Sequence, residues 1–291
     1  MSEKKKVEGS RFLRESKPAL KHLLGILLRK YEYASILAVD SEAKIYSVAA
    51  SGINIGDFGM LCNRGFVIKV YNEGEYAEYS FNKLERDVTE QAQQIIEQIE
   101  ALKKAVPDKL ERIKLGMLED KPLKFSKSTE YEINPFETGA QNIIDKLTAL
   151  RKKGLEADER MLDCTARMSC QKYSKLFLSE NKDMEQNVLW TDCAMSFLAR
   201  RGNEVKSYFR SASNLGGSEI LESLEADIPH SVEMTVALLD SEPMVPGEYD
   251  CICTPEVTGM IVHEAFGHGV EMDMFAKDRA LAKNYVGGDV A

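Results

Sequence analysis

The stretch Phe66-Val-Ile-Lys-Val-Tyr-Asn-Glu-Gly-Glu-Tyr-Ala-Glu-Tyr-Ser-Phe81 predicts a β-hairpin. Aromatic and β-branched residues fill both halves, and Asn72-Glu73-Gly74 between them is typical of a hairpin turn. Two further β-like runs, Ala34–Val39 and Lys44–Ala50, come before it. Because these runs are short and closely spaced, we expect a small, mostly antiparallel sheet.

A helix is expected before this sheet. Ser16 can cap it, Pro18 fits its first turn, and leucines followed by Tyr31 recur at helical spacing. The residues before it are rich in charge and lack apolar periodicity. We therefore predict that residues 1–16 form a disordered tail.

A second helix is expected after the sheet. Asn82 can cap it, its apolar residues recur every three or four positions, and Pro107 would stop it. Helix, sheet and helix together predict an N-terminal α+β domain over residues 17–106.

Residues 107–242 are predicted to form a linker and a central domain. Asp108–Glu137 is rich in Lys, Glu, Ser and Pro without clear periodicity, which indicates a surface linker. A helix is expected at Thr138–Lys153, with Gly154 as its C-terminal cap. Arg201-Gly202-Asn203 then predicts a turn between two strands. The β-like segments are Met161–Ser169, Tyr173–Leu178, Val188–Ala199 and Val205–Ser211, and the helical ones are Ser218–Leu224 and Ser231–Leu239.

A third domain is expected to begin at residue 243 and to occupy residues 243–291. Pro243 and Pro246 mark the boundary, and the pattern of Tyr249–Cys253 predicts a strand. The fold class predicted for the chain is α+β, with a small N-terminal α/β domain and a central mixed α/β domain.

The charge balance restricts the class of partner. The 291 residues hold 38 Lys and Arg against 47 Asp and Glu, a formal net charge of −9, with a pI of about 5.2. Nucleic acid and anionic membranes require a basic surface, so neither is expected as a partner. The apolar runs are shorter than the ~18–20 residues that span a membrane, and the start has no apolar signal segment. We expect a cytoplasmic protein.

The six cysteines are too sparse for a disulfide framework in a chain of this length. Reduced thiols in the core are expected, because free cysteine is among the most buried residue types. This includes Cys251 and Cys253, whose spacing of two would put both on one side of a strand. A redox or metal-binding role is the alternative for this pair. Trp190, in an apolar β-like run, is also predicted to lie in the core.

Chemistry is expected in the segment His263-Glu-Ala-Phe-Gly-His-Gly-Val-Glu-Met-Asp273. It holds two of the four histidines of the chain. With so few histidines, a His-acid-x-x-x-His match arises by chance roughly 0.006 times per chain. Coincidence is therefore a poor explanation of the pattern.

The histidine spacing predicts an unusual backbone. The usual zinc-protease pattern, H-E-x-x-H, puts two histidines on one helix face with a glutamate base beside the metal. His263 and His268 are five residues apart, which separates them by about 140° on a regular helix. A single π-helical turn would bring them together, and Gly267 supplies backbone freedom for it. We predict such a distorted turn.

Two readings of this segment stay open. If the imidazoles converge, His263 and His268 can bind a catalytic Zn²⁺, and Glu264 can act as the general base. Catalytic zinc needs a third protein ligand, which the segment does not identify. In the alternative, Glu264 and His268 pair on an ordinary helix and no metal is bound.

The segment resembles the H-E-x-x-x-H-G-x-E-x-D signature of the TldD/PmbA metallopeptidases, also described as modulators of DNA gyrase. The domain order is similar too, since the family has a β-rich C-terminal domain whose beginning carries the motif helix. Asn134-Pro135-Phe136 and Gly216-Gly217 add a similarity of pattern. The resemblance implies a zinc-dependent peptidase that processes small or unfolded peptides, with His263 and His268 as metal ligands and Glu264 as the base.

The resemblance also implies a partner subunit. Family members work as homo- or heterodimers of TldD/PmbA-type subunits, and the motif puts this chain on the TldD-like side. Glu271 and Asp273 match motif positions as well. They are expected either to orient a metal-binding histidine or to be solvated or helix-capping acids.

The third zinc ligand in the family is a cysteine further along the C-terminal domain, and none of the six cysteines here matches it. The resemblance therefore predicts that these residues hold an incomplete form of the peptidase. The other function left open is a non-catalytic, peptide-binding subunit or scaffold of a TldD/PmbA-type complex. Such a subunit would hold an extended peptide along a strand edge.

Overall fold

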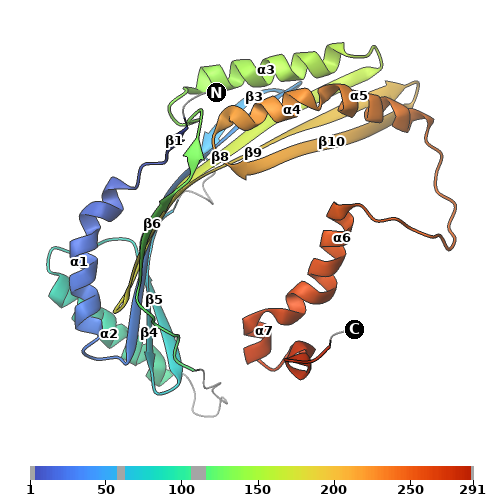
Figure 1. The fold of residues 1–291 in the computed structure, drawn as a ribbon. Coiled ribbons are helices and arrows are strands. Elements are labelled where there is room, and N and C mark those ends of the chain that lie inside the picture. The colour runs from blue at the N-terminus through green and yellow to red at the C-terminus, as the bar shows by residue number, and fades with distance from the viewer. Residues whose placement is uncertain (1–3, 58–62, 106–115, 290–291) are drawn as a thin grey trace.

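The computed structural model describes residues 4–57, 63–105 and 116–289 of the chain. Eight strands form one sheet. They are β2 (Tyr33–Ala49), β3 (Gly52–Asp57), β4 (Arg64–Asn72), β5 (Glu75–Phe81), β6 (Leu123–Ser128), β8 (Met161–Ser179), β9 (Lys182–Arg201) and β10 (Glu204–Leu215). The order is β10-β9-β8-β2-β4-β5, with β3 beside β2 and β6 beside β9. The predicted α+β class is confirmed (Figure 1).

Helices cover one face of this sheet, on the convex side (Figure 1). α1 (Arg11–Leu27) and α2 (Val88–Ala105) form one group, and α3 (Ala140–Glu156), α4 (Leu221–Ala226) and α5 (Ile228–Ala237) form the other. The short 3₁₀ turns η1 (Ser218–Ile220) and η2 (Leu238–Asp240) border α4 and α5. None of the helices in the described part of the chain is long and apolar enough to cross a membrane.

Strand β2 serves both groups of helices. Ile36 and Ala38 are buried in the core under α1 and α2, whereas Tyr46 and Val48 are buried in the core under α3, α4 and α5. All four side chains lie on one face because their positions differ by even numbers. One continuous strand therefore supports two cores.

Long strands replace the short ones predicted from the sequence. Ala34–Val39 and Lys44–Ala50 are parts of β2, which runs without a break through the polar residues between them. In that stretch Asp40 to Ala43 pair with Ser174 to Gln171 of β8. The backbone hydrogen bonds continue there whatever the side chains are, so the loss of apolar pattern does not end the strand.

The disordered tail predicted for residues 1–16 is wrong for the residues that the structure describes. β1 (Lys5–Lys6) pairs antiparallel with β7 (Glu130–Tyr131). Val7 is 5% exposed and packs with Tyr131 in a small separate core. Pairing with a strand that is distant in the sequence therefore orders this charged segment. A local sequence pattern does not predict such a contact.

Ser10, rather than Ser16, caps the first helix. Its Oγ accepts a hydrogen bond from the Leu13 N–H at 3.1 Å and donates one to Asp40 of β2 at 2.5 Å. The cap is thus selected by a contact with the sheet. As a result, Pro18 lies inside α1 instead of in its first turn.

The start of α2 also differs from the prediction. Oδ1 of Asp87 accepts hydrogen bonds from the N–H groups of Thr89 and Glu90 at 2.9 and 3.0 Å, which makes Asp87 the cap. Asn82 comes before this start and does not cap the helix. The stop predicted at Pro107 lies outside the described residues.

The predicted linker Asp108–Glu137 contains part of the sheet, although its first eight residues lie outside the described part. β6 pairs in parallel with β9, Leu123 opposite Lys182. Most of its side chains are exposed on both faces, so no apolar alternation marks it in the sequence. The division into domains 17–106 and 107–242 stays a prediction, because one sheet passes through both.

Gly154 lies inside α3 and does not end it, since the helix continues to Glu156. A Cβ atom at this position would lie 2.9 Å from Sγ of Cys164 and 3.1 Å from Cε1 of Phe197. Glycine therefore lets α3 lie close against β8 and β9. The predicted C-terminal cap is wrong because the glycine serves helix–sheet packing.

We expect Gly154→Ala to lower the free energy of unfolding by about 1–3 kcal/mol, because the new methyl group overpacks a filled contact. Gly25→Ala is a matched control inside α1, where nothing lies within 4 Å of the added Cβ. That variant should gain up to about 1 kcal/mol. Denaturant unfolding measures both, and equal stabilities of the two variants would contradict the close packing at Gly154.

The face of the sheet opposite the helices carries exposed apolar side chains. Trp190 is 42% exposed and Phe209 is 54% exposed. Leu189 and Thr191 of β9 are both buried, Leu189 against Val7 and Tyr131, so Trp190 between them points to the opposite face. Its predicted place in the core is wrong, because an apolar run alone does not tell which face is covered.

The cysteines fall into two groups. Cys251 and Cys253 are exposed, against the prediction, because Tyr249–Cys253 forms no strand and packs on nothing that would cover them. Cys62 lies outside the described residues. Burial raises the thiol pKa to about 12 in the core cysteines, Cys164, Cys170 and Cys193.

We expect iodoacetamide to label Cys251 and Cys253 in the native protein, because both thiols are exposed to the reagent. The three buried thiols should stay unlabelled until denaturant is added, because they are inaccessible and protonated. Peptide mass spectrometry reads each site. Native-state labelling of Cys164 as fast as that of Cys251 would contradict the burial.

Candidate metal centre

The predicted motif follows a short helix, α6 (Pro255–Val262), on the concave side of the sheet (Figure 1). Pro255 occupies the first turn, where its missing N–H breaks no helical hydrogen bond. The acid Glu256 beside it is favoured by the positive end of the helix dipole. Three turns carry the motif: η3 (His263–Gly267), η4 (His268–Val270) and α7 (Met272–Ala276).

Turn η3 is a π-helical turn, which confirms the distorted turn predicted from the histidine spacing. It brings the imidazole rings of His263 and His268 to a centroid distance of 4.6 Å, with 69° between their planes. On a regular α-helix the same side chains would point about 140° apart. The two histidines, five residues apart, therefore lie on the same side of the helix because of the π turn.

Gly267 has a different part in this turn from the one expected. Its φ of −55° and ψ of −51° are ordinary helical values, so the turn does not use the freedom of glycine. A Cβ would have its nearest neighbour, Nδ1 of His263, at 3.7 Å. The π turn is therefore compatible with a side chain at position 267.

The structure brings together the three residues that the sequence selected. One ligand atom from each of His263, Glu264 and His268 lies within 4.8 Å of the others. A Glu264 carboxylate oxygen lies 3.6 Å from Nε2 of His268, and the other lies 4.0 Å from Nε2 of His263. All three side chains are more than half exposed. The cluster is an open surface site.

This donor set fits a metal ion of the zinc type. Tetrahedral ligands at about 2.1 Å from zinc lie about 3.4 Å from one another, so side-chain rotations of modest size would close the cluster around an ion. The two imidazoles suit Zn²⁺ better than Ca²⁺ or Mg²⁺, which prefer oxygen ligands, and the carboxylate of Glu264 lies close enough to act on a metal-bound water. The exposed side leaves room for a substrate.

The two remaining motif acids have different contacts. Oε1 of Glu271 lies 2.8 Å from Nδ1 of His268. This hydrogen bond, with the charges of Glu271 and Glu264, raises the pKa of His268 above its ordinary value of 6.5. Asp273 pairs with Lys277 at 3.1 Å, a hydrogen bond that lowers the pKa of its carboxyl. Glu271 therefore contacts His268 and Asp273 contacts Lys277, and the role of each acid stays a prediction.

Some features of the site were not evident from the sequence. Neither Cys251 nor Cys253 belongs to the described cluster. Apolar side chains next to it are exposed, among them Met260 at 60% and Phe266 at 47%. The spacing of apolar residues in the sequence does not predict this exposure, because the same apolar side chains would also fit a buried helix.

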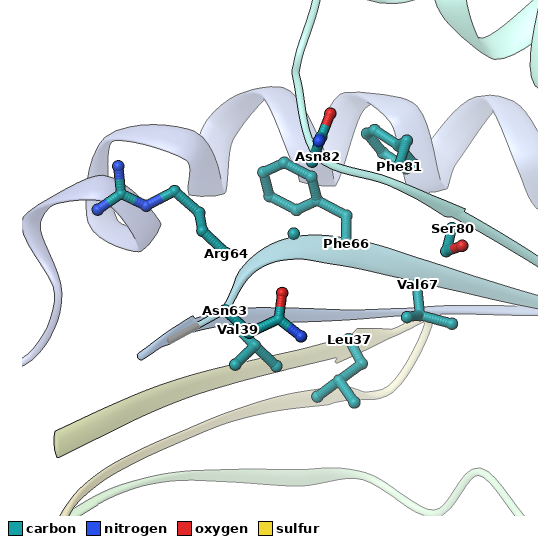
Figure 2. Close-up of a pocket in the computed structure, with 10 residues that line it drawn as sticks. Leu37, Val39, Asn63, Arg64, Phe66, Val67, Ser80, Phe81 and Asn82 are labelled. Carbon is teal, nitrogen blue, oxygen red and sulfur yellow. The ribbon is translucent and has the colours of Figure 1, made fainter. Parts of the chain in front are cut away.

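A pocket elsewhere in the protein offers less chemistry. It has a volume of about 490 Å³ and is lined by residues of β2, β4 and β5 and their ends (Figure 2). Arg64 is the charged residue of its lining. Nε of Arg64 donates to Asp40 at 2.8 Å, and its guanidinium lies 4.5 Å from the ring centre of Phe12. The charge of Arg64 is therefore paired with Asp40. The described lining of the pocket offers no group of side chains for acid–base catalysis or for metal binding.

The chain is similar in sequence to curated proteins named metalloproteases, although no family model matches it. A metalloprotease of Synechocystis sp. is 25% identical over 284 residues, which cover 89% of this chain and 54% of the relative. A metalloprotease of Methanothermobacter thermautotrophicus is 30% identical over 99 residues, 33% of this chain and 22% of the relative. The chain thus spans about half the length of the first relative and less of the second.

Solved structures share the fold. A candidate modulator of DNA gyrase from Bacteroides thetaiotaomicron superposes with a TM-score of 0.60 and 16% identity, over 88% of this chain and 57% of that one. A candidate gyrase modulator from Thermotoga maritima gives 0.60 at 14% identity, over 79% and 50%. TldE from Thermococcus kodakarensis gives 0.53 at 17% identity, over 76% and 47%. These likenesses establish the fold.

We expect metal binding to depend on how many residues separate His263 from His268, because the π turn aligns the two rings only at the native spacing. Deleting Ala265 makes the spacing four, which a regular α-turn places on one face, so Zn²⁺ binding should be kept. Inserting an alanine after Ala265 makes the spacing six and should weaken binding by about tenfold or more. Competition titration with a zinc chelator measures both, and an insertion variant that binds like the native protein would contradict the geometry.

Proposed function

We propose that this chain, which has the TldD/PmbA fold and is similar to curated metalloproteases, works as a metallopeptidase of the TldD type. The observation that carries the proposal is the convergence of His263, Glu264 and His268 on one side of a π-helical turn. In zinc proteases of the H-E-x-x-H type, two histidines and a glutamate on one side of a helix supply the metal ligands and the general base, and the π turn gives this chain a similar convergence.

His263 and His268 would hold the metal, which we propose is Zn²⁺. When bound, the ion would act as a Lewis acid toward a peptide carbonyl. The imidazoles must be neutral to bind it. Glu264 would take a proton from the attacking water on its carboxylate and return it to the leaving amine nitrogen.

The proposed substrates are small or unfolded peptides. The three residues lie on an exposed surface instead of in an enclosed cavity. An open site admits an extended chain, and the exposed Phe266 and Met260 nearby provide apolar surface for its side chains. A compact small molecule would have little enclosing protein surface to contact at this open site.

The assembly and location also form part of the proposal. We propose a homo- or heterodimer of TldD/PmbA-type subunits in the cytoplasm, with no nucleic acid or membrane as partner. The uncovered apolar side chains of the motif segment support a protein partner. The net charge of −9 supports the exclusion of anionic partners.

A peptide-binding scaffold is the second candidate function. It is favoured by β10, which ends the strand order of the large sheet and pairs with β9 along one side in the described part of the chain. The other side of such a strand can pair with an extended peptide through backbone hydrogen bonds. Peptide binding without any cleavage would support this function.

The metallopeptidase proposal predicts one bound metal ion and chelator-sensitive cleavage of unstructured peptides. Glu264→Gln should keep the metal and lose cleavage by about 10²–10⁴-fold, because the general base is removed. Asp273→Asn, a matched control whose carboxylate pairs with Lys277, should change neither. Elemental analysis and a fluorescent peptide assay measure both properties, on these 291 residues and on a longer form that also carries the third ligand of the family.

Two results would contradict the proposal. In a longer form of the protein that also carries the third ligand of the family, the absence of metal after loading, or cleavage that a chelator does not stop, would exclude a metallopeptidase. Peptide binding that is equal in the native protein and in Glu264→Ala, with no cleavage by either, would favour the scaffold.

A further inference from the structure

The two ring nitrogens of His268 have different carboxylate neighbours. Nδ1 lies 2.8 Å from Oε1 of Glu271, within hydrogen-bond distance. Nε2 lies 3.6 Å from a carboxylate oxygen of Glu264 and faces the three-residue cluster. One nitrogen is therefore engaged from outside the cluster, and the other is presented to it.

The backbone explains how Glu271 reaches back to His268. The 3₁₀ turn η4 ends at Val270, and Glu271 has extended dihedral angles, with φ of −62° and ψ of 132°. The chain changes direction there before α7 begins at Met272. A residue three positions after His268 can thus place its carboxylate beside the imidazole.

We infer that Glu271 is a positioning residue for the metal centre: its carboxylate holds the proton of His268 on Nδ1 and leaves the Nε2 lone pair directed at the cluster. This inference rests on the proposed metal site. The nitrogen of a histidine that binds metal is determined by the hydrogen bond that the other nitrogen makes. A carboxylate partner also fixes the ring orientation and strengthens the ligand.

A purely stabilising role explains the contact less well. The side chains of His268 and Glu271 are 51% and 49% exposed, and exposed ion pairs contribute little to stability. The other motif acid, Asp273, has a comparable contact with Lys277 that leads away from the cluster. It therefore serves as the matched control for a surface carboxylate in the same segment.

The first test reads the His268 tautomer in the metal-free protein. Long-range ¹H–¹⁵N NMR at about pH 8.5, where an ordinary histidine is neutral, should show the proton on Nδ1 of His268. Glu271→Ala should shift it toward Nε2. Glu271→Gln should keep it on Nδ1, because the amide oxygen still accepts the hydrogen bond. Asp273→Ala should match the native protein.

The second test measures Zn²⁺ affinity by competition with a chromophoric chelator. Glu271→Ala should bind about 10–100-fold more weakly than the native protein. Glu271→Gln should recover part of this loss, and Asp273→Ala should bind like the native protein. A folding defect is checked by circular dichroism of each variant.

The outcomes separate this inference from the proposed function. A native His268 with its proton on Nε2 would overturn the inference, as would equal zinc affinity in the native protein and Glu271→Ala. A native protein that binds no zinc would overturn the proposed metal site itself. The shifted tautomer together with weaker binding in Glu271→Ala, both rescued in Glu271→Gln, would support the positioning role.

Discussion

The antiparallel pairing of β2 with β8 is the interaction on which the rest of the fold depends. It runs without interruption from Ser35 opposite Ser179 to Val48 opposite Ala166. Because side chains alternate along each strand, this single register directs apolar residues toward α1 and α2 at one end and toward α3, α4 and α5 at the other. A shift by one residue would turn both cores to the uncovered face. The two helical groups are thus coupled through the sheet.

The motif segment is organised by a different principle. No residue of α6 is buried, so packing does not hold its side chains in place. The π turn and the change of direction at Glu271 determine which side chains meet. A site formed in this way owes its arrangement to local backbone geometry, and metal binding would supply the energy that fixes it.

The fold and the site therefore have separate physical origins, and this explains why the comparisons inform them unequally. Solved structures at 14–17% identity share the fold, because a fold can be kept by a pattern of apolar and polar residues without the same side chains. The chemistry requires particular side chains in one short segment. For that reason the proposed function rests on His263, Glu264 and His268 and not on the shape of the domain.

The sequence by itself determined the features that have a local cause. The hairpin turn forms at Asn72-Glu73-Gly74, with positive φ at Glu73 and Gly74, and the π turn lies where the spacing of the two histidines predicted it. Only the tertiary structure decided that Ser10 caps α1, that Gly154 lies in a helix–sheet contact and that β2 is one strand. These three features depend on residues that are far away in the sequence. A local sequence pattern does not indicate which distant residues will pack against a segment.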